Sequence, residues 1–177
     1  MEHLLKLLEY NFWANDLFIT RLTLNESIPT EVQKQLSHLL SAHQIWLGRI
    51  NGRGSLPSVW ESIDPETWEG VNIELYNETT DLVKSISLGT TFTYKNTRGI
   101  PFQNSLENLI THILHHSTHS ELKLLYLCAS IVFYLHKVII FSIYASEQSE
   151  LTCCNCSFKN LIFTVLIQYH PLKISLL

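Results

Sequence analysis

The sequence lacks an excess of basic residues. It contains 12 Lys and Arg against 16 Asp and Glu, so its formal net charge at pH 7 is -4. Proteins that bind nucleic acid by charge neutralise phosphates with clustered Lys and Arg side chains. The composition therefore disfavours nucleic-acid binding, and we expect a small-molecule substrate.

A secretory signal is also lacking at the N-terminus. Such a signal needs a basic start, an unbroken apolar stretch and a cleavage site made of small residues. The first segment instead carries Glu2, Glu9 and Asp16 among its apolar residues. We therefore expect a cytoplasmic location.

Glycine, tryptophan and arginine are absent from the C-terminal part of the chain. All six Gly, all four Trp and all four Arg precede residue 100, whereas all four Cys follow residue 120. The tail is apolar and has no glycine to end a helix. Its single Cys-x-x-Cys, Cys153 to Cys156, is too little for a zinc ribbon, which needs two pairs. We expect one helical domain at residues 1–121 and an atypical apolar tail at 122–177, which would complete the last helix.

Apolar residues recur at helical spacing in four segments. Three of these segments cover residues 2–23, 31–50 and 64–86, and the fourth begins near residue 106. The expected N-caps are Thr30 for the second helix, Asp64 for the third, and Asn104 or Ser105 for the fourth.

The stretch TTFTYKNTRGIPF, residues 90–102, breaks the helical period. Its β-branched and aromatic residues flank a turn-like KNTRG, which predicts a short hairpin or an irregular crossover. We therefore expect an all-α fold, a four-helix bundle with this long crossover or short hairpin before helix four.

Four histidines are concentrated in ITHILHHSTHSELKLL, residues 110–125: His112, His115, His116 and His119. They form two overlapping pairs with a spacing of four residues, and such a pair can offer two imidazoles to one metal ion from one helix face. The second segment, LSHLLSAHQIWLGRI, supplies His38 and His43 as further ligands. Imidazole ligands suit a single divalent ion such as Zn, Ni or Fe.

The same segments resemble the DinB-like, or YfiT-like, metal-dependent bundle family. The resemblance covers residues 4–119 and is carried by YNFWAN, LSHLLSAHQIWLGRI and YKNTRGIPFQNSLENLITHILHHSTH. It implies a four-helix bundle with a three-histidine metal site. Some relatives are thiol transferases that use the metal ion to activate a low-molecular-weight thiol.

The resemblance places two metal ligands at His38 and His116. The helical pattern alone would favour His43, which lies nearer the centre of the apolar stripe, over His38. The third family ligand falls four residues after His116, where this chain has Ser120. His119 is a substitute third ligand, but a spacing of three residues turns its imidazole away from the position that a spacing of four would give. We therefore expect weak metal binding by His38, His116 and His119.

The residues after Ser120 suggest a change of reading frame. The family usually places a basic residue, a small residue and Gln after its last histidine, and this chain has Glu-Leu-Lys. The bases GAG-CTC-AAA encode Glu-Leu-Lys, and with a preceding C they also read CGA-GCT-CAA, which encodes Arg-Ala-Gln. Deleting one base from two adjacent His codons does not yield a Ser codon, so Ser120 requires a further base change. A frameshift would account together for the missing ligand, the change in composition and the absent family ending.

Three functional hypotheses follow. The first is a metal-dependent hydrolase or thiol transferase with a compromised site. It would act on a small molecule and could form a homodimer. The second is an inactive, truncated or frameshifted family member. The third is a small membrane-anchored protein that uses residues 122–145 as its span. A lysine near the middle of that stretch disfavours the membrane-anchored protein, because burying it in the bilayer costs roughly 2.5 to 3.5 kcal/mol of insertion free energy.

Overall fold

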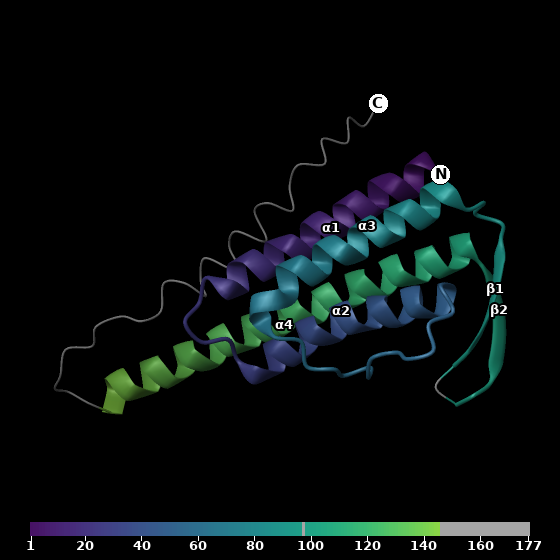
Figure 1. Ribbon diagram of the computed structural model, residues 1–177. Coiled ribbons are helices and arrows are strands. Elements are labelled where there is room, and N and C mark those ends of the chain that lie inside the picture. The colour runs from purple at the N-terminus through teal and green to yellow at the C-terminus, as the bar shows by residue number, and fades with distance from the viewer. Residues whose placement is uncertain (97, 146–177) are drawn as a thin grey trace. The chain divides into compact units, whose positions relative to one another are not determined.

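The computed structural model describes the backbone of residues 1–96 and 98–145 and the side chains of 1–96 and 98–130 (Figure 1). The elements are α1 (Glu2–Thr23), α2 (Thr30–Ile50), the 3-10 helix η1 (Pro65–Thr67), α3 (Trp68–Ser85), β1 (Thr91–Lys95), β2 (Pro101–Ser105) and α4 (Leu106–Ala145). The protein is therefore mostly helical, as expected, with one small sheet in addition. The Cys-x-x-Cys of the tail lies outside the described residues.

The chain divides into two compact units, residues 1–122 and residues 123–177. All four helices contribute to the core of the first unit. Its buried members are Leu4, Leu8, Ile50, Val83, Leu106, Leu109, Ile110, Ile113 and Leu114. None of the helices within residues 1–96 and 98–145 has the length and apolar character needed to cross a membrane.

The hairpin prediction for residues 90–102 is confirmed. Strands β1 and β2 are antiparallel, with Thr91 opposite Ser105 and Lys95 opposite Pro101. The turn is closed by the Asn96 side chain, whose Oδ1 accepts the N–H groups of Arg98 and Ile100 at 2.9 and 3.0 Å. Gly99 has a φ of 76°, a left-handed value that glycine adopts at low cost.

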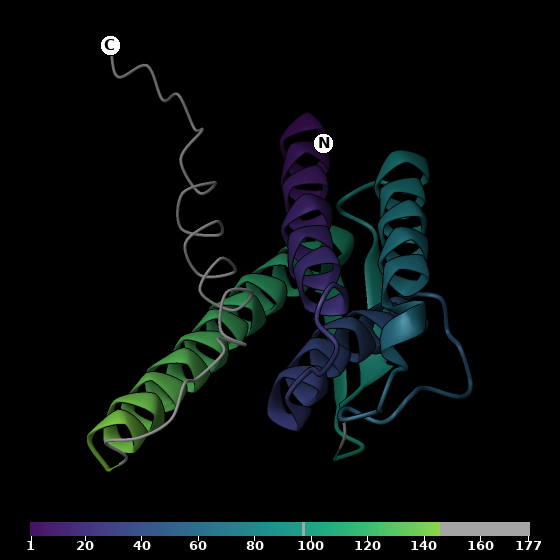
Figure 2. The same ribbon diagram turned by 90° about the vertical axis from the view of Figure 1, so that its left-hand side faces the viewer.

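The N-cap predictions have mixed outcomes. Asp64 caps η1, because its Oδ1 accepts the N–H of Glu66 at 3.1 Å. Thr30 is not a cap: it is already the first residue of α2, and the extended Pro29 precedes it without a side-chain cap. The connection between α2 and η1 contains no helix or strand and runs as an open loop in Figure 2.

The start of α4 is held by its neighbours in the chain. The N–H groups of Leu106 and Glu107 donate to the carbonyls of Thr90 and Leu88, at 2.8 and 3.0 Å. The third N–H, that of Asn108, donates to the Ser105 Oγ at 3.3 Å. Ser105 is therefore the N-cap, one of the two residues expected.

Removing this cap should destabilise the fold modestly. We expect Ser105→Ala to lower the free energy of unfolding by about 1 kcal/mol, because the N–H of Asn108 loses its partner. Urea denaturation measures the change, and Ser105→Asp, which restores an acceptor, should recover most of it. Equal stability of the alanine variant and the natural chain would show that the cap contributes nothing.

Candidate functional site

His38 of α2 and His116 of α4 lie together in the first unit. Their ring centroids are 5.1 Å apart and the rings meet edge to face at 68°. His38 is buried and His116 is half-buried. Two residues that are 78 positions apart in the sequence are thus neighbours, which the resemblance predicted and the helical pattern alone did not.

The ring of His38 is oriented by the loop that follows α2. Its Nδ1 lies 2.8 Å from the carbonyl oxygen of Val59, and the ring stacks on Trp60 with a centroid distance of 4.1 Å. Because a carbonyl can only accept, Nδ1 carries the proton and Nε2 keeps its lone pair. Histidines that bind metals commonly donate their second ring N–H in this way. His38 therefore fits the role of a metal ligand through Nε2.

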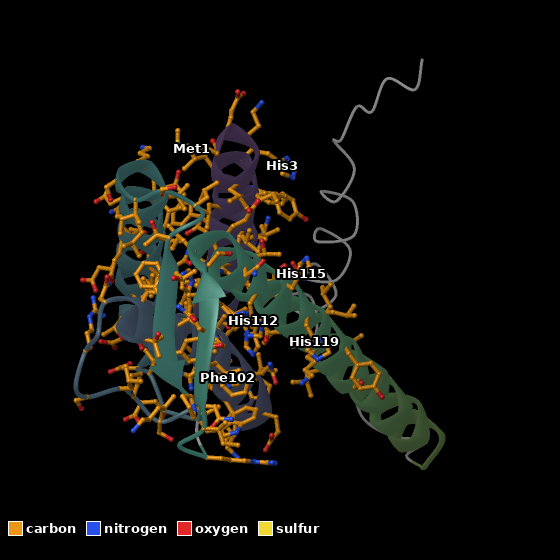
Figure 3. All side chains as sticks on the ribbon, turned by 90° about the vertical axis from the view of Figure 1, so that its right-hand side faces the viewer. Met1, His3, Phe102, His112, His115 and His119 are labelled. Carbon is orange, nitrogen blue, oxygen red and sulfur yellow. The ribbon has the colours of Figure 1, made fainter. Side chains whose placement is uncertain are left out.

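Ser120 occupies the position four residues after His116. Its side chain is buried, with 1% exposed, one turn after His116. His119 is exposed, and Figure 3 shows it on α4 with His112 and His115. Successive helical residues are rotated by about 100°, so His119 and Ser120 project in different directions.

The full ligand set His38, His116 and His119 is not gathered in the structure. Within residues 1–96 and 98–130, no three His, Cys, Asp or Glu side chains form a group that could hold a metal ion. Among the described side chains the donor set is therefore a two-histidine pair, which does not fit a three-histidine centre. No reaction step through a metal follows from it.

His43, the alternative ligand of α2, has another role. It is buried, and its Nε2 lies 2.8 Å from the Thr79 Oγ1, whose hydroxyl donates to the carbonyl of Leu75 at 2.7 Å. The Nε2 of His43 is therefore the donor to Thr79. Burial, and secondarily the charge of His116, lowers the pKa of His43 to about 4. His43 is a neutral residue that links α2 to α3.

A buried polar network extends from Glu121, the residue after Ser120. The Nδ2 of Asn11 donates to the Ser117 Oγ at 2.6 Å and to the Glu121 Oε1 at 3.1 Å. The network continues through Asn15 to Asn72 of α3, with an N–O distance of 3.3 Å. The second oxygen of Glu121, Oε2, is buried and has no hydrogen-bond partner. Burial raises the pKa of Glu121 to about 7, although its bonds to Ser117 and Asn11 oppose the shift.

A row of rings continues from the histidine pair along α2 and α4. His112 lies 6.3 Å from His116 and 4.6 Å from Trp46, measured between ring centroids. Burial, followed by the charges of Arg49 and His115, lowers the pKa of His112. The guanidinium carbon of Arg49 lies 4.5 Å from the Trp46 ring centroid. The candidate site is therefore bordered by aromatic and cationic side chains.

Sequence reasoning missed Trp60, Arg49 and the network around Glu121. Trp60 lies in a loop, so no periodicity could have placed it against His38. The network had a visible signal, since Asn11 and Asn15 are polar residues four positions apart on the apolar side of α1. Arg49 gave a weaker signal, because it is a single charged residue in the last turn of α2, between Leu47 and Ile50 of the apolar stripe.

No family model, curated protein or solved structure matches this chain.

Proposed function

We propose that the chain is a four-helix-bundle protein of the DinB-like type with an incomplete metal site, at which His38 and His116 bind a divalent ion weakly. The observation that carries the proposal is the meeting of these two rings, 5.1 Å apart, from two different helices. The Nδ1 contact of His38 with the Val59 carbonyl supports it, because it leaves Nε2 available. Zn, Ni and Fe are the ions that suit such imidazole ligands.

The natural chain should have little activity of its own under this proposal. Catalytic zinc sites hold the metal with three protein ligands and leave a fourth position open. With two histidines, the ion keeps more water and dissociates more readily. Under this proposal, hydrolysis or thiol transfer on a small cytoplasmic substrate would require a site with its third ligand restored.

Alanine substitutions test the proposed pair. We expect His38→Ala and His116→Ala each to weaken Zn²⁺ binding at least about 10-fold, because each removes one of two ligands. Calorimetric titration measures the dissociation constant. His115→Ala is the matched control, since it removes an exposed histidine from the same helix. If all three variants bound Zn²⁺ as the natural chain does, the pair would not be the site.

A second candidate, an inactive frameshifted family member, is favoured by the surroundings of Glu121. Natural folds seldom bury a carboxyl oxygen without a partner, and the Oε2 of Glu121 is such an atom. This misfit begins one residue after Ser120, where the sequence departs from the family pattern. Local conflicts of this kind argue against a sequence selected for its fold. The nucleotide sequence around codon 120 tests the idea, and an identical frame in close relatives would contradict it.

A further inference from the structure

Arg49 is a cation that lies against aromatic rings. Its guanidinium carbon is 4.5 Å from the Trp46 ring centroid and 5.6 Å from that of Tyr94. Its Nε is buried and makes no hydrogen bond. Among the residues whose side chains the structure describes, no carboxylate forms an ion pair with it.

Some cations of the first unit have carboxylate partners that Arg49 lacks among the described side chains. Arg53, one turn further along the chain, pairs with Glu78, and Lys6 and Lys34 pair with glutamates on their own helices. Arg49 is also more buried than these side chains, and burial lowers its pKa. A partly desolvated guanidinium is a strong attractor for an oxyanion, because charge-assisted hydrogen bonds gain strength away from water.

The rings beside Arg49 form an ordered apolar wall. The hydroxyl of Tyr94 donates to the Asn104 Oδ1 at 3.0 Å, which ties its ring to the hairpin. Phe102 stacks on Tyr94 with a centroid distance of 6.0 Å, and 45% of its surface is exposed. Phe102 thus offers an exposed apolar surface that stacks on Tyr94, the ring that the Arg49 guanidinium also contacts.

We propose that Arg49 binds the carboxylate of a small aromatic acid, with the apolar part of the acid against Tyr94 and Phe102. A planar carboxylate matches the planar fork of a guanidinium and can accept two parallel hydrogen bonds. The subsite lies next to the histidine pair, since Trp46 contacts His112, which in turn lies beside His116. It does not rest on the proposed metal site, because it requires no metal ion.

Benzoate is a suitable probe, and benzamide is its uncharged counterpart. We expect benzoate to shift the Trp46 indole N–H and Arg49 Nε–H resonances of the ¹⁵N-labelled, metal-free full chain in a saturable manner. Benzamide should bind at least about 10-fold more weakly, because it lacks the charge that the guanidinium recognises. Arg49→Gln should weaken benzoate binding by a similar factor, and Arg53→Gln, whose guanidinium is already paired, should leave it unchanged.

Two results would overturn the assignment. Equal binding of benzoate and benzamide to the natural chain would show that no cation is involved, and this comparison needs no variant. Unchanged benzoate binding by Arg49→Gln would place the anion elsewhere. Since Zn²⁺ is absent throughout, either failure leaves the proposal for His38 and His116 untouched, and loss of Zn²⁺ binding leaves this subsite untouched.

Discussion

The Ser120→His variant is expected to bind Zn²⁺ at least about 100-fold more tightly than the natural chain. Replacing even an outer partner of a metal ligand changes affinity by about 10- to 100-fold, and a direct ligand contributes more. Position 120 is the right place, because it is buried one helical turn after His116. Residues four apart project from the same face, so the new imidazole would join the side on which His38 lies.

Calorimetric titration of Zn²⁺ into both proteins measures the gain. Thr118→His is the matched control, because it adds a histidine to the same helix at an exposed position that faces elsewhere. Ser120→His inserts a larger side chain into a buried position, which costs about 1 to 3 kcal/mol if the surroundings do not adjust. Circular dichroism must therefore show that the variant is folded. A folded variant with the affinity of the natural chain would contradict the expectation.

The second large effect is a pH dependence of stability that arises from Glu121. Its pKa is raised from 4.5 to about 7 in the folded chain. Between these values the folded chain holds a proton that the unfolded chain releases, so stability falls as the pH rises from 4.5 to about 7. The loss amounts to about 3 kcal/mol and persists at higher pH.

His43 acts in the opposite direction over almost the same range. Its pKa is lowered from 6.5 to about 4, so the unfolded chain binds the extra proton between these values. Stability from this group is therefore complete above pH 6.5 and is lost as the pH falls toward 4, again by about 3 kcal/mol. The two pH dependences have opposite slopes and nearly cancel between pH 4.5 and 6.5, so the stability of the natural chain changes little with pH in that range.

Single substitutions should separate the two contributions. Relative to the natural chain, Glu121→Gln should gain about 3 kcal/mol of stability between about pH 4.5 and 7, because an amide does not titrate. His43→Gln should show the opposite trend, gaining stability relative to the natural chain as the pH falls below 6.5. Urea unfolding at a series of pH values gives both curves. Parallel curves for Glu121→Gln and the natural chain would show that the buried carboxyl does not titrate abnormally.

Much of the helical architecture could be predicted from the sequence. The spacing of apolar residues located all four helices, since a helix that buries one face must repeat its apolar residues with a period near 3.6. The β-branched residues around KNTRG located the hairpin. The Thr30 cap was predicted wrongly because Pro29, in an extended conformation, ends the preceding turn and lets Thr30 begin the helix itself.

The site was only partly predictable, because periodicity reports which residues face inward and not which helix they meet. His38 and His43 are both buried, and only the tertiary arrangement places one beside His116 and the other beside Thr79. The stacking of Trp60 on His38 depends on a loop with no periodic pattern. Glu121 could not have been identified as a buried carboxylate either, since charged residues are expected at the surface.

The most direct test of the proposed incomplete histidine site is X-ray diffraction at the zinc absorption edge from crystals of Ser120→His grown with Zn²⁺. The account predicts one anomalous peak within about 2.0 to 2.1 Å of three nitrogens, those of His38, His116 and the introduced imidazole. A peak coordinated by His112, His115 or His119 instead, or no peak near His38, would contradict it.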